Sequence, residues 1–246
     1  MKIVEVAVIT GGTRGIGAAI AMALAKRKVR LILNGRKNDS ETEQLLKGLG
    51  ELTDVRLVVG DAADEATAKQ IAKLAEEQFG RIDYAVPAAG GPNPGKITDL
   101  SVDQWMDAFN LHVHAVFHLF RACHSLLAQR GGGFLMIGSV AGRRGCPSTV
   151  AYQTVKGALP QMARALARDH AHEGIRVNVI EPGIIRTRFH AAMTPEAERN
   201  NLDNRIPLRR FGTPEHVASA ALELLTNPFI TGETLVIDGG MSMRMV

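Results

Sequence analysis

The stretch Thr10-Gly11-Gly12-Thr13-Arg14-Gly15-Ile16-Gly17 decides the fold of this chain. It follows an apolar run of strand length and precedes an amphipathic run of helix length. Gly11 permits a tight turn, Gly15 lets a pyrophosphate approach the backbone, and Gly17 lets the helix pack closely on the strand. The first turn of the helix offers free N–H groups to phosphates. Glycines in this strand–turn–helix context predict a dinucleotide-binding turn.

Outward from this turn, apolar runs of strand length alternate with amphipathic runs of helix length. Strands are expected at 3–9, 30–34, 55–59, 84–87, 134–137, 175–180 and 234–237. Helices are expected at 16–26, 41–49, 64–79, 102–127, 150–172 and 214–225. This strict alternation predicts an α/β fold, in which a parallel sheet is covered by helices on both faces.

The length of the chain, 246 residues, suits one hydrophobic core, and the sequence shows neither a repeat nor a linker. Residues 1–246 are therefore expected to form a single domain. The stretch 186–211 interrupts the rhythm, because it is polar, charged and too long for an ordinary loop. We expect it to form a small lid.

The composition excludes several classes of protein. No run reaches 18 apolar residues, so a membrane span is not expected, and the absence of a signal-peptide pattern predicts a cytoplasmic location. A net charge of +4 does not require nucleic acid as a partner. Two cysteines, Cys123 and Cys146, are too few for a disulfide framework. No acid near His112, His114 and His118 completes a metal site, so none is expected.

The choice of cofactor depends on the end of the second expected strand, which reads Asn34-Gly35-Arg36-Lys37. A carboxylate there would bind the ribose 2′-hydroxyl of NAD, whereas arginine suits the 2′-phosphate of NADP. The first carboxylate comes only at Asp39, and Arg14 in the glycine turn can converge on the same place as Arg36. The sequence therefore predicts NADP(H) rather than NAD(H).

Candidate catalytic residues cluster around the fifth expected strand. Tyr152 and Lys156 are four residues apart in a helical stretch, so their side chains share one face. A nearby ammonium favours the phenolate, which is expected to lower the pKa of the tyrosine. Ser139 follows the apolar run 134–137 and so lies at the carboxyl end of a strand, where open α/β sheets bind ligands. Asn110 is an amide inside a long helix, where such a residue needs a purpose.

Together these pieces resemble the short-chain dehydrogenase/reductase family over nearly the whole chain. The matching pieces are Thr10–Gly17, Asp61-Ala62, Ala89-Gly90, Asn110, Ser139, Tyr152 to Lys156, Pro182-Gly183 through Thr187, Thr231-Gly232 and Asp238-Gly239-Gly240.

The resemblance implies a three-layer Rossmann fold with a seven-stranded parallel sheet, and a catalytic tetrad of Asn110, Ser139, Tyr152 and Lys156. In the family the lysine also binds the nicotinamide ribose, and the asparagine holds a water that relays protons to it. The cofactor-binding residues expected from the turn, the second strand and the resemblance are Gly11, Thr13, Arg14, Gly15, Ile16, Gly17, Asn34, Arg36, Asp61, Ala62, Ala89, Gly90, Tyr152, Lys156, Pro182, Gly183, Ile185 and Thr187. Among these, Asp61 and Ala62 resemble adenine contacts, and Ile185 and Thr187 contacts to the carboxamide.

The chain departs from the family pattern after the fourth expected strand. The usual Asn-Asn-Ala-Gly reads Pro87-Ala88-Ala89-Gly90, which removes an amide that normally ties the central strand to its neighbours. We expect this change to affect cofactor affinity and local stability more than the chemistry. Gly138 also replaces a serine that often precedes the catalytic one.

The resemblance implies hydride transfer between NADP(H) and a small-molecule ketone or secondary alcohol. A 3-oxoacyl-thioester reductase resembles the pattern best, including Ile206-Pro207-Leu208 before Arg210-Phe211-Gly212. Arg130 matches a basic residue that meets the acyl carrier in such reductases, but Glu173 stands at the other basic position. Sugars or polyols, small ketones and steroid-like compounds remain as alternative substrates. A protein that senses NADP(H) without turnover is the alternative from a different class.

Two further points stay open. Arg143, Arg144, Arg186 and Arg188 flank the expected catalytic centre, and they either bind an anionic substrate or are solvated loop charges. Family members often assemble through their two long helices, here 102–127 and 150–172, so a homodimer or homotetramer is expected.

Overall fold

The structure is a computed structural model that describes residues 4–191 and 193–243. Within these residues, seven parallel strands form one sheet in the order β3-β2-β1-β4-β5-β6-β7. The strands are β1 Val6–Thr10, β2 Arg30–Gly35, β3 Val55–Val59, β4 Tyr84–Pro87, β5 Gly133–Ile137, β6 Arg176–Pro182 and β7 Thr234–Ile237. Successive strands are added on one side of β1 up to β3 and on its other side from β4 onward. The point between β1 and β4, where the strand order reverses, is where such sheets bind ligands. The expected three-layer Rossmann fold is confirmed.

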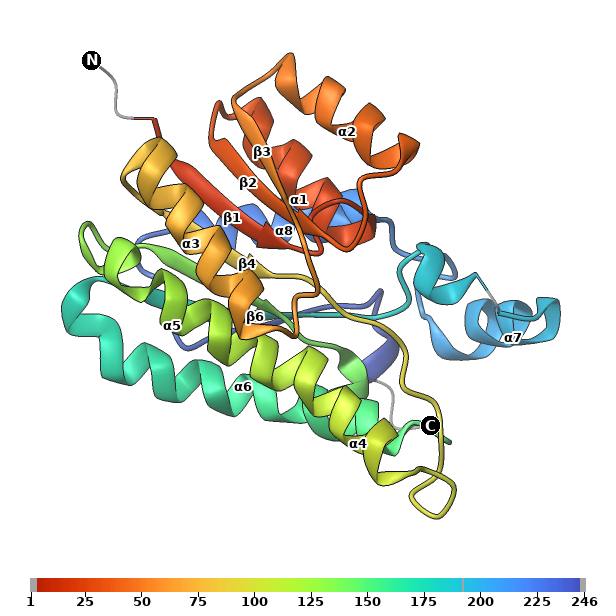
Figure 1. The fold of residues 1–246 in the computed structure, drawn as a ribbon. Coiled ribbons are helices and arrows are strands. Elements are labelled where there is room, and N and C mark those ends of the chain that lie inside the picture. The colour runs from red at the N-terminus through yellow and green to blue at the C-terminus, as the bar shows by residue number, and fades with distance from the viewer. Residues whose placement is uncertain (1–3, 192, 244–246) are drawn as a thin grey trace.

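Helices cover both faces of the sheet (Figure 1). They are α1 Gly15–Lys26, α2 Ser40–Gly50, α3 Glu65–Phe79, α4 Val102–Phe109, α5 Ala115–Ala128, α6 Val150–His170, α7 Pro195–Asn200 and α8 Pro214–Thr226. One apolar core joins α3, α5 and α6 to the sheet, and the other joins α1, α2 and α8. Within β1, Val8 belongs to the first core and Ala7 and Ile9 to the second, so alternate side chains are buried on opposite faces.

The expected helix 102–127 is not continuous. It begins at α4, where Ser101 and Gln104 form a capping box. A π-helical turn, Asn110–His114, then interrupts it before α5 begins. Single π-helical turns are rare and occur often at functional sites, because the wider turn redirects the side chains that follow it.

The expected lid, 186–211, contains short helical pieces, among them α7, and projects beyond the edge of the sheet (Figure 1). A bridge between Ile185 and Gly212 closes its base. The first strand begins at Val6, later than the expected residue 3, which lies outside the described residues. In the described ranges, helices that combine the length and the apolar character needed to cross a membrane are absent.

Candidate active site

The glycine turn between β1 and α1 leaves no room for side chains where the backbone bends. Gly11 has φ +62°, and a Cβ on it would lie 2.7 Å from the backbone of Ala89. A Cβ on Gly17 would meet the carbonyl of Gly11. Gly15 has φ +52°, and its open side faces the methyl group of Thr187 at 3.5 Å. This cradle, at the start of α1, fits the pyrophosphate of a dinucleotide.

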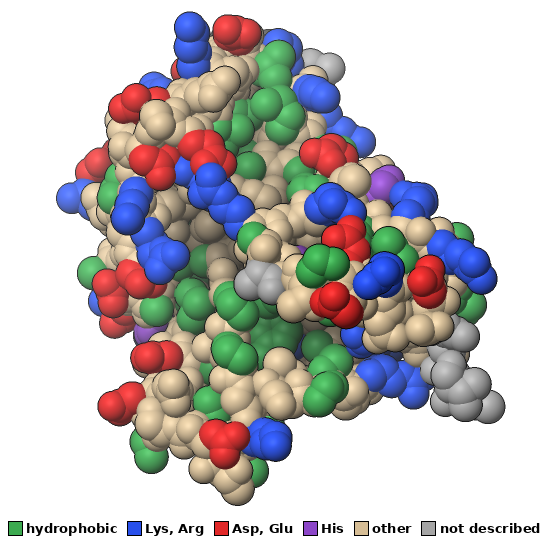
Figure 2. Space-filling model, turned by 90° about the vertical axis from the view of Figure 1, so that its right-hand side faces the viewer, with side chains coloured by type: hydrophobic (Ala, Val, Ile, Leu, Met, Phe, Trp, Pro, Cys, Tyr) green, Lys and Arg blue, Asp and Glu red, His purple; other side chains and the backbone are tan. Residues whose placement is uncertain are grey.

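Other predicted cofactor residues meet the cradle at the carboxyl edge of the sheet. Gly183 packs against Asp238, since a Cβ on it would lie 2.7 Å from the Asp238 side chain. Ile185 and Ala62 are buried, while Asp61 is exposed and its carboxylate accepts a hydrogen bond from the backbone of Ala63 at 2.9 Å. Figure 2 shows this edge as a hollow lined by apolar side chains beside the lid.

Of the two cofactor-binding residues predicted around the end of β2, one is exposed and the other is buried. Arg36 is exposed. Asn34 is buried, and its amide nitrogen donates to the carbonyls of Val58 at 3.2 Å and Gly60 at 3.0 Å. The Asn34 amide therefore joins β2 to the end of β3 and the residues after it, which is a structural role.

The guanidinium of Arg14 is held by acidic and polar groups of α2 and its N-cap. It forms ion pairs with Asp39 and with Glu41, the latter at 3.2 Å, and it donates to the hydroxyl of Thr42 at 3.0 Å. Hydrogen bonds from the Thr42 backbone and from Arg14 lower the pKa of Asp39 to about 2. Asp39 is therefore ionised at neutral pH, and it competes with any cofactor phosphate for Arg14.

Ser139, Tyr152 and Lys156 come together at the junction of β5 and α6. Ser139 is the second residue after β5, and its hydroxyl accepts a hydrogen bond from the backbone N–H of Ala141 at 3.2 Å. The Lys156 ammonium donates to the carbonyl of Ile137 at 2.6 Å and lies 5.8 Å from the centre of the Tyr152 ring. Lys156 is only 6% exposed, and its burial lowers its pKa to about 8.

The pKa of Tyr152 shifts in the direction opposite to the one expected. Burial raises the pKa of Tyr152, and a hydrogen bond with Ser139 offsets part of this rise. Desolvation of the phenolate thus outweighs the expected effect of the Lys156 ammonium. The phenol keeps its proton at neutral pH, so Tyr152 can act as a proton donor.

The π-helical turn brings His112, and not Asn110, against the tyrosine. The His112 ring packs edge-on against Tyr152, with 5.5 Å between ring centres. Asn110 instead accepts a hydrogen bond from the Nδ1 atom of His114 at 2.9 Å. Residues two apart in a helix point to nearly opposite sides, because each residue turns by about 100°. Three of the four predicted catalytic residues thus lie together, the role expected of Asn110 stays a prediction, and His112 is a further residue that contacts Tyr152.

Phe189 of the lid is the second residue that the sequence did not single out. Its ring lies 5.7 Å from the Tyr152 ring, on a segment 37 positions away in the chain. The side chain is 39% exposed. Only tertiary packing of the lid reveals this contact.

The four arginines that flank the centre have partners within the protein. Arg143 pairs with the fully buried Glu181, and Arg144 donates to the carbonyl of Ser242 at 3.1 Å; both arginines line a cavity of about 480 Å³. Arg186 pairs with Glu198 at 2.9 Å, and Arg188 pairs with Glu41. These contacts hold the lid and the loop after β5 in place. The four arginines therefore have a structural role, whether or not they also bind an anionic substrate.

Comparisons with known proteins agree with this geometry. A family model described as enoyl-(acyl carrier protein) reductase matches residues 11–242. The human 3-oxoacyl-[acyl-carrier-protein] reductase is 32% identical over 243 residues, covering 97% of this chain and 98% of the relative. Glucose 1-dehydrogenase 2 of Bacillus subtilis is 31% identical over 245 residues, covering 97% of this chain and 95% of the relative.

A solved short-chain dehydrogenase/reductase from Mycobacterium ulcerans superposes with a TM-score of 0.91 at 27% identity, over 98% of this chain and 90% of that one. A variant of a short-chain dehydrogenase/reductase from Serratia marcescens also gives 0.91, at 28% identity, over 98% of this chain and all of that one. The chain is an oxidoreductase of this class. It belongs to the short-chain dehydrogenase/reductase family.

Proposed function

We propose that this protein is an NADP(H)-dependent reductase of ketones, and in reverse a dehydrogenase of secondary alcohols. The observation that carries the proposal is the group of Ser139, Tyr152 and the buried Lys156, at the same edge of the sheet as the glycine cradle. When bound, the nicotinamide supplies a hydride to the carbonyl carbon. Tyr152 gives its phenolic proton to the carbonyl oxygen, so the C=O bond becomes CH–OH. Ser139 holds that oxygen, and the Lys156 ammonium stabilises the phenolate that remains.

NADP(H) is preferred in this proposal because of the charges around the end of β2. Residues 34–37 contain no carboxylate, and Arg36 is exposed there. Arg14 supplies a second guanidinium once a phosphate displaces its acidic partners. Binding of the dianionic 2′-phosphate therefore exchanges one set of charge-assisted contacts for another.

The substrate class that fits best is a 3-oxoacyl thioester. Relatives named 3-oxoacyl-[acyl-carrier-protein] reductase match over nearly the whole chain. The apolar hollow in Figure 2 and the Phe189 ring favour an apolar acyl chain over a polyol, whose hydroxyl groups would lose hydrogen bonds there. Glu173 accepts hydrogen bonds from His124 at 3.0 Å and His170 at 2.7 Å, which lower its pKa, so its negative charge persists and weighs against an acidic carrier rather than against the thioester itself. A sugar is the second candidate, because a relative is named glucose 1-dehydrogenase.

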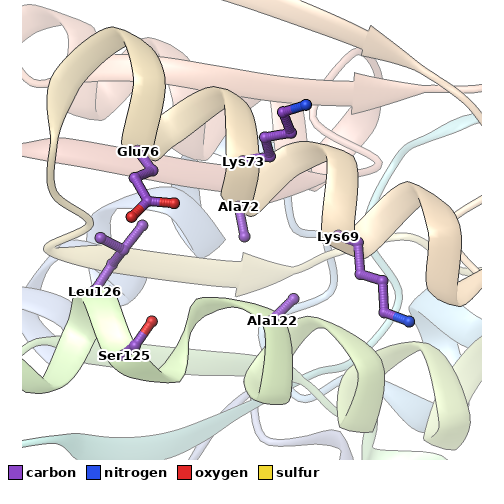
Figure 3. A pocket seen from close by; sticks show the side chains of 7 residues that line it. All are labelled: Lys69, Ala72, Lys73, Glu76, Ala122, Ser125 and Leu126. Carbon is purple, nitrogen blue, oxygen red and sulfur yellow. The ribbon is translucent and has the colours of Figure 1, made fainter.

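A second hollow, of about 230 Å³, lies between α3 and α5 (Figure 3). The small side chains Ala72, Ala122 and Ser125 leave this space between the two helices. It lies on a helical face of the sheet, away from Tyr152, so we assign it to helix packing rather than to substrate.

The test is NADPH oxidation, followed by absorbance, with acetoacetyl thioesters, diketones and glucose-type sugars, and with NADH in parallel. We expect turnover with the oxoacyl thioester and a higher kcat/KM with NADPH than with NADH. Tight NADPH binding without turnover of any substrate would favour the sensor, and turnover of sugars alone would favour the second candidate.

A further inference from the structure

The imidazole of His112 has a fixed tautomer. Its Nε2 atom lies 3.0 Å from the carbonyl of Gly91 and 3.2 Å from the side-chain oxygen of Asn93. Both oxygens only accept hydrogen bonds, so Nε2 must carry the proton. The other nitrogen, Nδ1, then bears a lone pair. His112 is 2% exposed, and among the described residues Nδ1 has no hydrogen-bond partner. A buried acceptor without a donor is costly unless something completes it.

A hydrogen-bond donor with too few acceptors, the Lys156 ammonium, lies near the His112 ring. The Lys156 ammonium has three N–H groups, of which the carbonyl of Ile137 takes one. Lys156 is also almost fully buried. Its charge is close enough to His112 to act on it, because the ammonium adds to burial in lowering the pKa of His112 to about 3. The Tyr152 ring contacts both groups, edge-on to the imidazole and 5.8 Å from the ammonium.

We propose that Nδ1 of His112 accepts a hydrogen bond from a water molecule that the Lys156 ammonium also binds, and thereby positions that ammonium beside Tyr152. This inference rests on the proposed function, since it assigns His112 a part in the same site. His112 is a positioning residue, because it acts on the tyrosine through Lys156. A ring that stays neutral near pH 7 accepts a hydrogen bond there but carries no proton, so it is not the acid of the reaction.

The second nitrogen of His112 ties this pair to the loop after β4. The Nε2–H group holds Gly91 and Asn93 in the segment that follows Pro87-Ala88, where the usual asparagines are missing. A Cβ on Gly90 would lie 3.0 Å from Cε1 of the ring, so the loop packs directly on the imidazole. One side chain thus connects the loop beside the cofactor cradle to the catalytic lysine.

Two substitutions separate the role of Nδ1 from the role of Nε2. In His112→Asn the side-chain oxygen can occupy the place of Nδ1, and the reach to Gly91 is lost. In His112→Gln the amide nitrogen can occupy the place of Nε2, and the acceptor at the δ position is lost. We expect His112→Asn to keep kcat within about threefold of wild type and His112→Gln to lower it at least about tenfold, with the larger loss expected when proton handling is impaired. His114→Asn, on the same turn, is the matched control and should keep kcat.

Each variant is first checked for a cooperative thermal transition and for NADPH affinity by fluorescence, so that a folding defect or a cofactor defect is separated from loss of kcat. His112→Gln should also change the alkaline limb of the kcat pH profile, which reports the Lys156–Tyr152 pair. If His112→Gln keeps kcat and the same profile while His112→Asn loses kcat, the ring serves only to hold the loop, and the proposal is overturned.

A measurement that needs no turnover distinguishes failure of this proposal from failure of the proposed function. In ¹⁵N NMR spectra of the whole protein, His112 should show the Nε2–H tautomer, with Nδ1 accepting a hydrogen bond. Lys156→Met should move the Nδ1 resonance to that of an unbonded nitrogen, and Lys73→Met, on the surface of α3, should leave it in place. An Nδ1 resonance that ignores Lys156→Met would refute the contact whether or not the enzyme reduces ketones.

Discussion

At the scale of single residues, Arg36 is exposed just after β2, where the proposed NADP(H) would place its 2′-phosphate. Arg36→Ala removes a charge-assisted contact of about 1.5–3 kcal/mol. NADP(H) affinity should therefore fall about tenfold or more, while NAD(H) affinity changes little. Fluorescence titration with both cofactors measures this, with Lys47→Ala on α2 as the control. Equal losses for the two cofactors would show that Arg36 contacts a part they share.

Gly35 is the position where an acid would normally be introduced to favour NAD(H), and here it cannot accept one. A Cβ on Gly35 would lie 2.6 Å from the hydroxyl of Thr13. An engineered switch of cofactor must therefore change Thr13 together with Gly35. The sequence showed which residues occupy this strand end, but the contact across the turn is a tertiary feature.

The buried imidazole of His112 makes stability depend on acid. Its pKa is about 3 in the folded protein, against an ordinary value of 6.5. Between pH 6.5 and pH 3, the unfolded chain therefore binds a proton at His112 that the folded chain does not bind. The free energy of unfolding falls as the pH decreases from about 6.5 to about 3. The contribution is fully present above that window and amounts to about 5 kcal/mol at most.

Urea unfolding at pH 7.5 and pH 4.5 measures this effect in wild type and in His112→Asn. The wild type should lose more stability on acidification than the variant does, because asparagine has no proton to gain. Identical losses in the two proteins would mean that other groups govern the acid response.

At the scale of elements, the glycine turn is the part that tolerates least change. Gly11→Ala places a methyl group against the Ala89 backbone at a positive φ, so both NADPH binding and stability should fall. Gly48→Ala, inside α2 and with open space around the new Cβ, should instead raise stability by about 0.5–1 kcal/mol. Thermal melts and NADPH titrations report both. A Gly11→Ala protein that binds NADPH normally would remove the turn from the cofactor site.

Most elements follow from local signals in the sequence. The apolar runs placed the strands within a few residues, and Ser101 marked the start of α4. The π-helical turn could not be predicted, because it shifts the helical periodicity by a single residue, which the apolar pattern of so short a stretch does not reveal. For that reason the contact between His112 and Tyr152 was missed, whereas Asn110, Ser139, Tyr152 and Lys156 could be proposed from the sequence as catalytic residues.

At the scale of the whole molecule, α4 and α5 carry exposed apolar side chains, with Val102 77%, Met106 42% and Phe117 46% exposed. We expect these two helices to associate copies of the chain into dimers or tetramers, since exposed apolar side chains that lie together mark interaction sites. Light scattering should give a dimer or a tetramer, and Phe117→Asp should reduce the assembled fraction. Dissociation by Phe229→Asp instead would place the interface beside β7.

The order of the strands also explains why the site lies where it does. The reversal between β1 and β4 opens the sheet at the glycine turn, and β5, β6 and the lid bring Ser139, Thr187 and Phe189 to the same edge. Alternation of elements predicted the layers and the edge. It could not predict how the lid folds back, because the contact between Phe189 and Tyr152 depends on packing between distant segments.

The most direct test of the central claim is a comparison of wild type with Tyr152→Phe. The substitution keeps the ring, its contacts with His112 and Phe189, and the cradle, and it removes the phenolic hydroxyl, with its proton and its hydrogen bond to Ser139. NADPH affinity measured by fluorescence should be unchanged. The rate of NADPH oxidation with the preferred ketone should fall by a factor of about 10²–10⁴, the usual contribution of a positioned acid. A Tyr152→Phe enzyme with wild-type kcat would contradict the assignment of Tyr152 as the proton donor.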